Sequence, residues 1–421
     1  MKDKNISRRI LSIALAAGLA VSCLTGCSGV ASEAETASDN IVVTEAGSLS
    51  VSDVTGGEIA ASGLFTERDL TQTADLSEAV SYTVSDGEDI HITEEGVYVL
   101  SGTASEVTVY VEADSSADAK IQLVLDGLNI TNSSFPCIYV KEADKVWITS
   151  AGENTLTVTG TFMTDGDTNT DGVIFSKDDL VLNGSGSLRI VSSDNGIVSK
   201  DDLKVTGGSY TIEAASDAME AKDSICIADG SFDLNAGEDA MHAENDEDDT
   251  LGYIWLGGGD YLITAGDDGI HAGTIVQIDG GNFRISGSEG IEGTRIQIND
   301  GTIAVEARDD GINATQKSGA YSVSLEINGG EISVAMGSGD TDGIDVNGDL
   351  TITGGTVSVT GQSAFDCDGS VQFTGGTVII NGQEVDSIPV QMMGGMGGQG
   401  MTGQGAMGPG MNHGGMGGRR G

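Results

Sequence analysis

Pairs of apolar residues separated by one other residue recur along most of the chain, with glycine-rich turns between the pairs. Leu203 and Val205 precede one such turn, and Tyr210 and Ile212 follow it. Alternation of this kind predicts β-strands that bury one face. The turn at residues 206–208 contains two glycines, which tolerate positive φ angles. The pattern therefore predicts a chain built almost entirely from short strands.

A short motif, in which an acidic or amide residue precedes a small and an apolar residue, marks a repeating unit. It begins, with the last copy altered, at Asn195, Asp217, Asp239, Asp268, Glu289, Asp310, Asp342 and Ser363. Subtracting successive positions gives steps of 22, 22, 29, 21, 21, 32 and 21 residues. Such a unit holds about three strands, too few for a propeller blade, and it lacks the leucine-rich repeat signature. We therefore predict an all-β parallel β-helix, whose coils stack about 4.8 Å apart.

The repeat is expected to occupy only part of the chain. Residues 1–27 combine basic residues with an apolar run and end in a lipobox-like Leu-Thr-Gly-Cys, which predicts a lipoprotein signal with a lipidated Cys27. An ordinary signal peptide cut elsewhere is the alternative. A disordered Ser/Thr/Ala/acidic spacer is expected over 28–75, and a disordered Gly/Met-rich tail over 386–421. The β-helix is expected over 76–385, with a cap and less regular coils over 76–165.

Charge and cysteine content limit the classes of partner. The 421 residues include 65 acidic and 19 basic side chains, for a net charge of −46. This balance argues against nucleic acid and against anionic membrane surfaces, so membrane contact is expected only through the lipid anchor. An anionic ligand would need a cation between itself and the protein. Cys137, Cys226 and Cys367 are far apart in the sequence and imply no disulfide framework.

Three Lys-Asp-Asp or Lys-Asp-Ser motifs are the most informative polar feature. They begin at Lys177, Lys200 and Lys222, at steps of 23 and 22 residues, so stacked coils would place them on one corner. Carboxylates about 4.8 Å apart repel by roughly 3–4 kcal/mol at an effective dielectric constant near 20. Either the lysines neutralise this column, or a hard cation lies between the coils. Ca²⁺ suits oxygen-only ligands. The predicted ligands are Asp178, Asp201, Asp202 and Asp223.

A second column of acidic residues accompanies the repeated motif. Its candidate Ca²⁺ ligands are Asp194, Asp217, Glu220, Asp239, Asp267 and Asp268. Aspartate before glycine also caps turns through its own side chain, so capping remains the alternative. His242 and His271 occupy the same position of adjacent units and are expected to be neighbours, either as a weak site or as plain corner residues. No nucleotide-binding or zinc-binding spacing is present.

Two insertions and one aromatic pair are the remaining candidates for a binding surface. The insertions lie near 244–249 and 315–321 and should leave the same corner as loops, which either mark a binding face or reflect tolerated drift. Tyr253 and Trp255 alternate with apolar residues that are expected to be buried. They are therefore predicted to point outward as a sugar-stacking surface.

The chain contains, among others, the stretches GVYVLSG, IQLVLDGLNITNSS, NGIVSKDDLKVTGG and DGIDVNGDLTITGG. Over about residues 82–385, such stretches resemble those of bacterial secreted and lipid-anchored carbohydrate-binding domain-containing proteins. The resemblance implies a right-handed parallel β-helix with bound Ca²⁺, similar to family 9 pectate lyases. It also implies binding of plant cell-wall glycans such as cellulose or polygalacturonate, and Ca²⁺ ligands at Asp178, Asp201, Asp202 and Asp223. The chain departs from the lyase pattern at Lys204 and Val205, and from the usual repeat glycine at Ala218 and Ala240.

The sequence thus favours a monomeric, non-catalytic glycan-binding lipoprotein displayed at the bacterial cell surface and stabilised by Ca²⁺. Lys177, Lys200 and Lys222 are candidates for glycan contacts. One alternative is a Ca²⁺-dependent lyase that uses one of these lysines as a base, although neighbouring carboxylates oppose the lowered pKa that a base needs. The other alternative is an adhesin or envelope scaffold without glycan specificity.

Overall fold

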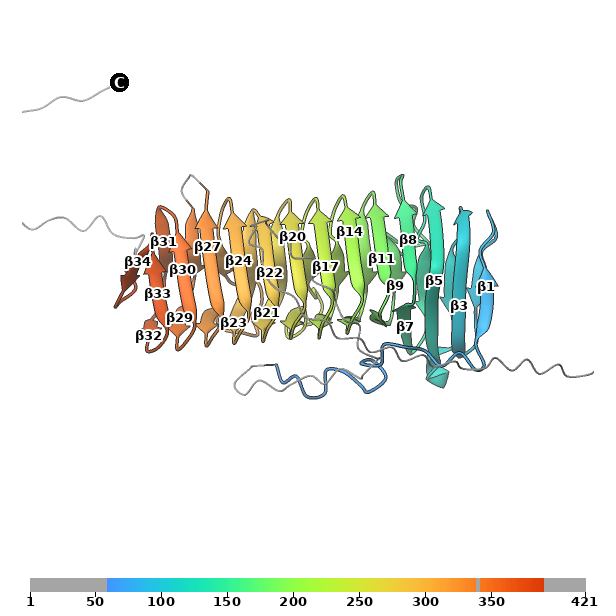
Figure 1. Ribbon diagram of the computed structural model, residues 1–421, viewed down its shortest axis with the longest axis horizontal. Coiled ribbons are helices and arrows are strands. Elements are labelled where there is room, and N and C mark those ends of the chain that lie inside the picture. Colours follow the sequence, from blue (N-terminus) through green and yellow to red (C-terminus); the bar gives the residue numbers. More distant parts are fainter. Residues whose placement is uncertain (1–58, 338–340, 390–421) are drawn as a thin grey trace, which may run out of the picture. The chain divides into compact units, whose positions relative to one another are not determined.

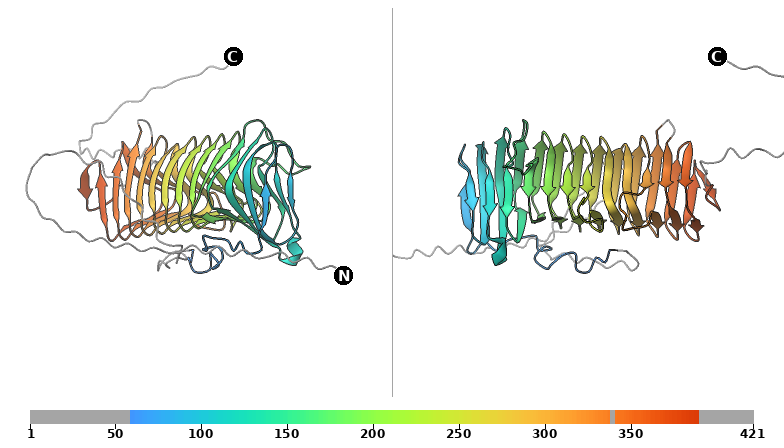
Figure 2. Two further views of the ribbon diagram at one scale, coloured as in Figure 1. Left: turned by 45° about the vertical axis from the view of Figure 1, so that its right-hand side comes forward. Right: turned by 180° about the vertical axis from the view of Figure 1, so that it is seen from behind.

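The computed structural model describes residues 59–337 and 341–389, in which β-strands stack coil upon coil from one end to the other (Figure 1). Every pair of named strands in these residues is parallel except β33 with β34. Each regular coil contributes one strand to each of three faces, and the views from an oblique angle and from behind in Figure 2 show the same stacking of coils. The predicted parallel β-helix is therefore confirmed.

Face 1 carries the repeated acidic motif in most of its coils. Its strands are β2 (Ile90–Ile92), β4 (Val109–Glu112), β6 (Ile138–Glu142), β9 (Gly172–Ser176), β12 (Asn195–Ser199), β15 (Met219–Ala221), β18 (Met241–Ala243), the first halves of β21 (Asp268–Ile278) and β23 (Glu289–Ile298), β25 (Ile312–Ala314), β28 (Asp342–Val346) and β31 (Ser363–Cys367).

Face 2 follows the Lys-Asp-Asp corner. Its strands are β1 (Val80–Thr83), the first halves of β3 (Gly96–Ser105) and β5 (Lys120–Asn132), β7 (Lys145–Ser150), β10 (Asp179–Gly184), β13 (Asp202–Val205), β16 (Ser224–Ile227), β19 (Tyr253–Leu256), the second halves of β21 and β23, β26 (Ser324–Ile327), β29 (Asp349–Ile352) and β32 (Val371–Phe373). One short 3-10 helix, η1 (Ser115–Ala117), precedes β5.

Face 3 follows the glycine turns. It contains the second halves of β3 and β5, then β8 (Glu153–Val158), β11 (Ser187–Ser192), β14 (Ser209–Ala214), β17 (Ser231–Ala236), β20 (Asp260–Ala265), β22 (Asn282–Gly287), β24 (Thr302–Ala307), β27 (Glu331–Met336), β30 (Thr356–Thr360) and β33 (Thr377–Ile380). The antiparallel strand β34 (Gln383–Val385) pairs with β33 at the end of the stack.

The interior is filled by columns of equivalent residues. On face 2, for example, Leu180, Leu203, Ile225 and Ile254 are register partners and are fully buried. On face 3, the interior rings of Tyr210, Phe232, Tyr261 and Phe283 stack with centroid distances of 5.4, 4.8 and 4.3 Å. Such stacks add to the free energy gained from burying apolar surface.

Glycine is required where a turn passes over this aromatic stack. Gly208 has φ 102°, and a Cβ there would lie 2.8 Å from the Tyr210 hydroxyl oxygen. That hydroxyl donates a hydrogen bond to the Gly207 carbonyl at 2.8 Å. The turn therefore needs glycine for both its backbone conformation and its space.

Residues 59–72, which we call the N-terminal strap, lie along face 2. At one end, Ile59 N–H donates to the Gln277 side-chain oxygen of β21 at 2.7 Å. Further along, the buried Asp69 accepts a hydrogen bond from the Trp147 indole of β7 at 2.9 Å. The strap therefore connects coils whose residues lie far apart along the solenoid.

The predicted disordered spacer over 28–75 is wrong for residues 59–75, because this segment has buried partners. Its apolar residues Ile59, Ala61, Leu64 and Phe65 pack against Cys226, Tyr253 and Trp255. The predicted export signal, Cys27, residues 28–58 of the spacer and residues 390–421 of the predicted tail lie outside the described residues. Among the residues described, no helix is long and apolar enough to cross a membrane.

The strap can be tested through intrinsic fluorescence, because the two tryptophans of the chain are Trp147 and Trp255 and both lie beneath it. We expect Phe65→Ala to red-shift tryptophan emission and to increase quenching by acrylamide, since the Phe65 ring lies 5.8 Å from the Trp255 ring. Loss of this partly buried contact should also cost about 1–2 kcal/mol in unfolding free energy. Glu67→Ala, at an exposed strap position, is the matched control. Identical spectra for Phe65→Ala and the parent chain would contradict the packing of Phe65 against Trp255.

Candidate functional site

The Lys-Asp-Asp motifs do stack on the corner between faces 1 and 2. Ser176 pairs in register with Ser199, and Ser199 with Ala221, immediately before the three motifs. Asp179 and Asp202 then begin the paired strands β10 and β13. Stacking of these residues is thus confirmed, whereas their role as Ca²⁺ ligands stays a prediction.

The lysines of this corner do not neutralise the stacked aspartates. Lys200 donates to Glu220 at 2.6 Å, and Lys222 forms an ion pair with Glu247 in the loop after β18. The Lys177 ammonium lies 6.0 Å from the centre of the Tyr139 ring on face 1. Within the described ranges, none of the three lysines forms an ion pair with Asp178, Asp201 or Asp223.

The corner aspartates therefore carry negative charge that is only partly compensated. Burial, together with the charges of Asp179, Asp223 and Asp202, raises the pKa of Asp201 to about 6. Burial also raises the pKa of Asp178, whose Oδ2 accepts the Ala143 N–H at 3.0 Å. An oxygen-only donor set with excess negative charge suits a hard cation such as Ca²⁺. Asp202 fits less well, because Lys204 already lies 3.2 Å from its Oδ2.

The anchor aspartates on face 1 cap backbone amides of neighbouring coils. Asp217 Oδ1 accepts the Asp239 N–H at 2.9 Å, and Asp239 Oδ1 accepts the Asp268 N–H at 2.8 Å. Capping, the alternative left open by the sequence, thus occupies one oxygen of each of these two carboxylates. Asp194 and Asp267 lie in the turns before this column, half-buried and exposed respectively.

Two histidines lie beside the second side-chain oxygens of Asp217 and Asp239, which cap no backbone amide. His242 and His271 are register partners on β18 and β21, with ring centroids 4.8 Å apart, so the predicted neighbourhood is confirmed. His242 Nδ1 lies 3.0 Å from Asp217 Oδ2, and His271 Nδ1 lies 3.1 Å from Asp268 Oδ2. We define the histidine–carboxylate cluster as Asp217, Asp239, His242, Asp268, His271 and Glu292.

Glu292 was not among the site residues predicted from the sequence, although its place in the repeat carried the necessary signal. Glu292 pairs in register with His271, and its Oε2 lies 3.3 Å from His271 Nδ1. It occupies the same repeat position as Glu220 and both histidines. The outward column of face 1 therefore presents ionisable residues on four successive coils.

The cluster is buried enough to perturb its proton affinities. Burial opposes protonation of His242, but the hydrogen bond and charge of Asp217 outweigh it and raise the pKa of His242 to about 9. Burial raises the pKa of Asp239 to about 7, and burial together with Glu292 raises that of Glu289 to about 8. In the absence of metal, the protonated His242 offsets carboxylate charge and is unsuited to act as a general base at neutral pH.

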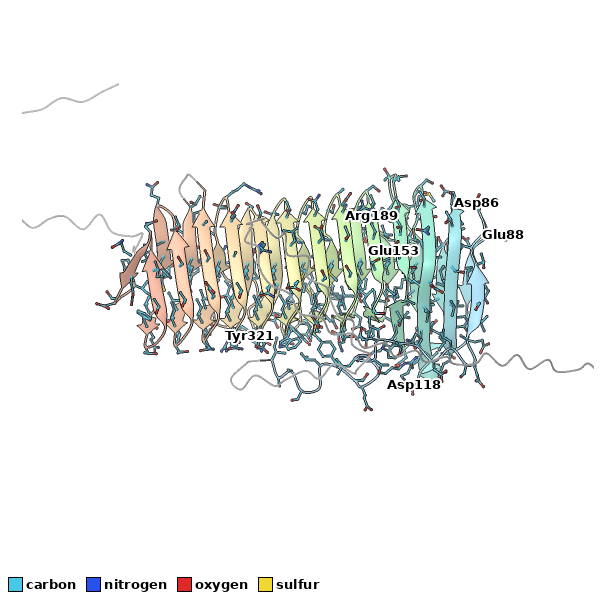
Figure 3. All side chains as sticks on the ribbon, viewed as in Figure 1. Asp86, Glu88, Asp118, Glu153, Arg189 and Tyr321 are labelled. Atoms are coloured by element: carbon cyan, nitrogen blue, oxygen red, sulfur yellow. The ribbon has the colours of Figure 1, made fainter. Side chains whose placement is uncertain are left out.

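Both insertions leave the solenoid at the corner between faces 1 and 2, so the prediction of a common corner is confirmed. Ser318 Oγ of the second loop donates to the Asp249 carbonyl of the first at 2.5 Å, and Tyr321, labelled in Figure 3, donates to the Thr250 carbonyl at 3.3 Å. Lys317 of the second loop also lies 2.8 Å from Glu292 Oε2. The two loops therefore contact each other beside one end of the cluster.

The predicted sugar-stacking pair is wrong. Tyr253 and Trp255 do point away from the interior, but Trp255 is only 1% exposed because the N-terminal strap covers it. Its indole N–H donates to Asp279 Oδ2 at 2.8 Å, and Tyr253 is half-buried in the same cluster. Trp147, only 2% exposed, lies beneath the strap as well.

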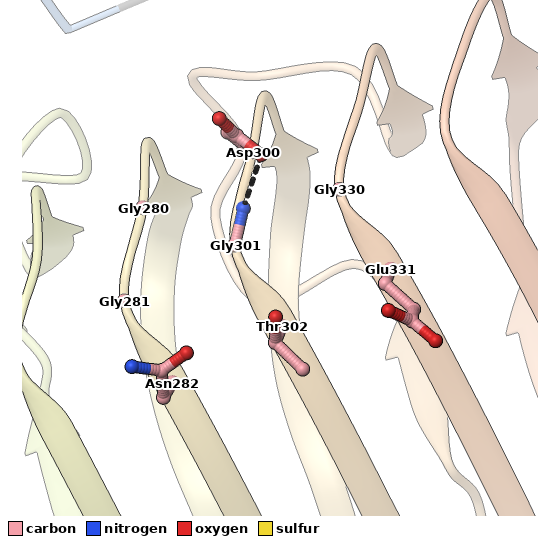
Figure 4. A pocket seen from close by; sticks show the side chains of 8 residues that line it. All are labelled: Gly280, Gly281, Asn282, Asp300, Gly301, Thr302, Gly330 and Glu331. Carbon is pink, nitrogen blue, oxygen red and sulfur yellow. Dashed lines mark hydrogen bonds between the residues drawn. The ribbon is translucent and has the colours of Figure 1, made fainter.

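An open groove lies where the glycine turns meet face 3 (Figure 4). It crosses three coils and is lined by Gly280, Gly281, Asn282, Asp300, Gly301, Thr302, Gly330 and Glu331. Five of these eight residues are glycine or threonine with little bulk, so polar side chains and turn backbone border an unobstructed track. On the same face, Glu153 of β8 and Arg189 of β11 are also exposed (Figure 3).

The raised pKa of the Glu289 carboxyl can be tested through the pH dependence of the protein's stability. Its folded-state pKa of about 8 exceeds its usual value near 4.5, so the folded state binds this proton more tightly than the unfolded state. The corresponding stabilisation is present at acid pH and is lost as pH rises through 8. In metal-free buffer, Glu289→Gln should therefore match the parent melting temperature below pH 4.5 and exceed it above pH 8. Glu306→Gln, at an exposed position, is the control, and parallel curves for Glu289→Gln would contradict the assignment.

Comparison with known proteins identifies the family of this chain. The family of carbohydrate-binding domain-containing proteins matches residues 86–342. A carbohydrate-binding domain-containing protein from Acetivibrio thermocellus is 37% identical over 287 residues, which cover 67% of this chain and 91% of that protein. A gadolinium derivative of the polysaccharide lyase-like protein from C. thermocellum is similar with a TM-score of 0.40 and 24% identity, covering 71% of this chain and 96% of that one. The chain therefore belongs to the family of carbohydrate-binding domain-containing proteins.

Proposed function

We propose that this chain is a non-catalytic polysaccharide-binding protein in which the glycan lies along face 3, parallel to the solenoid axis. Family membership supports the ligand class, and the open, in-register surface of face 3 is the observation that carries the proposal. Lipidation at Cys27 would display a monomeric solenoid at the cell surface. The glycans expected are plant cell-wall polysaccharides of the cellulose or polygalacturonate type.

The other two faces are less available to an extended chain of sugars. The N-terminal strap covers much of face 2. On face 1, the rings of Tyr139 and Phe175 are fully buried, and Asp165 in the loop before β9 accepts a hydrogen bond from the Tyr139 hydroxyl. Further along face 1, the side chains of the histidine–carboxylate cluster form ion pairs and hydrogen bonds with one another. Face 3 carries no such cover in the described residues.

Face 3 offers a hydrogen-bonding group on every regular coil. At the first outward position of its strands stand Ser187, Ser209, Ser231, Asp260, Asn282, Thr302, Glu331, Thr356 and Thr377. The coils repeat about every 4.8 Å, a spacing comparable to one sugar residue of an extended polysaccharide. A glycan parallel to the axis would therefore meet an equivalent polar group at each sugar, and many weak contacts would add up.

Two exposed residues of face 3 add an apolar contact and a positive charge to its hydrogen-bonding groups. Leu262 is 51% exposed and lies beside Arg284 in an open depression of face 3. Leu262 would contact the apolar face of a sugar ring, and Arg284 would pair with a uronate carboxylate. With both tryptophans buried, we propose that hydrogen bonds and these two contacts replace aromatic stacking.

The proposed binding site for Ca²⁺ is the Lys-Asp-Asp corner. Asp201 and Asp223 of adjacent coils would hold the ion, with Asp202 adjacent and Asp178 directed at the Ala143 N–H of the preceding coil, and bound Ca²⁺ would supply positive charge that this column lacks. The second predicted set fits Ca²⁺ less well. Asp217 and Asp239 cap backbone amides, whereas Glu220 is occupied by Lys200 and Asn195.

The lysines of the corner favour binding over lyase chemistry. A lysine base needs a lowered pKa, but the contact with Glu247 raises that of Lys222, and Glu220 holds Lys200 at 2.6 Å. Incubation with polygalacturonate should therefore yield no ultraviolet-absorbing unsaturated product. Accumulation of that product would overturn the non-catalytic part of the proposal.

The glycan-binding face can be tested by substitution. We expect Leu262→Asp and Arg284→Glu each to weaken retardation of the protein in affinity gels containing polygalacturonate by about tenfold, equivalent to about 1.4 kcal/mol. Leu76→Asp replaces a leucine of matching exposure, 54%, outside face 3 and should not alter binding. Unchanged retardation of both face 3 variants would refute this placement. Absence of binding to any glycan by the parent chain would favour an adhesin or scaffold.

The calcium site gives a separate prediction. After removal of metal by EDTA, Asp201→Asn should melt at or above the temperature of the parent chain, because it removes a carboxylate that is costly to ionise. Added Ca²⁺ at 100 times its dissociation constant should stabilise the parent by about 2.7 kcal/mol, raising its melting temperature, and the variant by less. Asp167→Asn, at an exposed turn, serves as the control. An equal rise in melting temperature of the parent chain and Asp201→Asn on addition of Ca²⁺ would contradict a Ca²⁺ site at this corner.

A further inference from the structure

We propose that the histidine–carboxylate cluster on face 1 is a binding site for one transition-metal ion of the Zn²⁺ type, separate from the corner assigned to Ca²⁺. Ligand atoms of Asp239, His242 and His271 all lie within 4.8 Å of one another. Those of Asp268, His271 and Glu292 do so as well. The residues come from adjacent coils, so a bound ion would connect β18 with β21.

The distances in the cluster are those expected around a small tetrahedral ion. Two ligands bound at about 2.1 Å in tetrahedral geometry lie about 3.4 Å apart. Asp239 Oδ2 lies 3.7 Å from His242 Nδ1 and 3.5 Å from His271 Nδ1. A small adjustment of the side chains would therefore let these three atoms coordinate one ion.

A fourth ligand is available on either side of this trio. Asp217 Oδ2 lies 3.0 Å from His242 Nδ1, and Asp268 Oδ2 lies 3.1 Å from His271 Nδ1. Neither oxygen yet lies within 4.8 Å of all three atoms of the trio, but movement of its side chain would let either one complete a set of two imidazole nitrogens and two carboxylate oxygens. Such a closed set, without an open position for substrate, is typical of structural rather than catalytic zinc.

The surroundings also resemble the supporting shell of a metal site. Asp239 Oδ1 accepts the Asp268 N–H at 2.8 Å, which fixes its carboxylate while Oδ2 remains directed at both histidines. His242 Nε2 is buried without a hydrogen-bond partner, and Glu244 Oε2 lies 3.4 Å away. Metal-bound histidines commonly donate their second N–H to a carboxylate, so a small movement of Glu244 would satisfy this atom.

Ligand chemistry separates this site from the proposed calcium corner. Imidazole nitrogen suits Zn²⁺ and related transition metals, whereas Ca²⁺ prefers sets made only of oxygen. The inference therefore does not depend on glycan binding or on Ca²⁺ at Asp201.

The test uses the full chain, stripped of metal by chelation and carrying His413→Ala so that the tail contributes no histidine. We expect one equivalent of Zn²⁺ by titration and elemental analysis, and Co²⁺ to give the visible absorption bands of a tetrahedral site. His242→Asn and His271→Asn, each made singly, should weaken Zn²⁺ binding at least tenfold and abolish those bands. The control is His91→Asn, because His91 lies on the same face but pairs with Glu112.

Two results would overturn the proposal: no stoichiometric Zn²⁺ binding by the parent chain, or retention of the Co²⁺ bands in both single variants. Circular dichroism and the melting temperature in EDTA establish that each variant folds. The response to Ca²⁺ should persist in both histidine variants, so failure of the zinc site is distinguishable from failure of the calcium corner.

Discussion

Hydrogen bonding between successive coils in strict register is the constraint on which the rest of this structure depends. Parallel strands of the same face pair residue by residue, so each side chain lies beside its equivalents one coil before and one coil after. Inside the solenoid this favours identical apolar residues, since they form continuous columns. Outside, the same register forces like polar groups together whatever their charge.

Columns of acidic residues are the electrostatic cost of that register, and the chain meets it in three ways. Asp217 and Asp239 direct an oxygen at the backbone amide of the next coil. Glu220 and Glu292 receive lysines from a corner and a loop. At Asp201 and Glu289 burial and neighbouring carboxylates raise the pKa to about 6 and about 8, so protonation removes the negative charge below those pH values. Capping uses only one oxygen of Asp217 and of Asp239, so the second oxygen of each remains directed at a histidine and available to a cation.

Much of this arrangement could be predicted from the sequence, because a repeat converts sequence spacing into spatial contact. The period predicted the fold, the stacked Lys-Asp-Asp motifs, the adjacency of His242 and His271, and the common exit of both loops. The lysine orientation was not predictable, since Lys200 has several carboxylates within reach and register does not decide among them. Glu292 occupies a repeat position whose equivalents in neighbouring coils are ionisable. The repeated motif begins three residues earlier, at Glu289, and does not include Glu292.

The N-terminal strap shows where this kind of prediction ends. The direction of Trp255 followed from alternation and was right, yet its exposure depended on Phe65, a residue outside every repeat. No periodicity links a non-repeating segment to partners as distant as Ile59 is from Gln277. The strap also changes the functional argument, because covering the tryptophans of face 2 leaves face 3 as the broad polar surface open to an extended ligand. On such a surface affinity must come from repetition, and repetition is what coil stacking supplies.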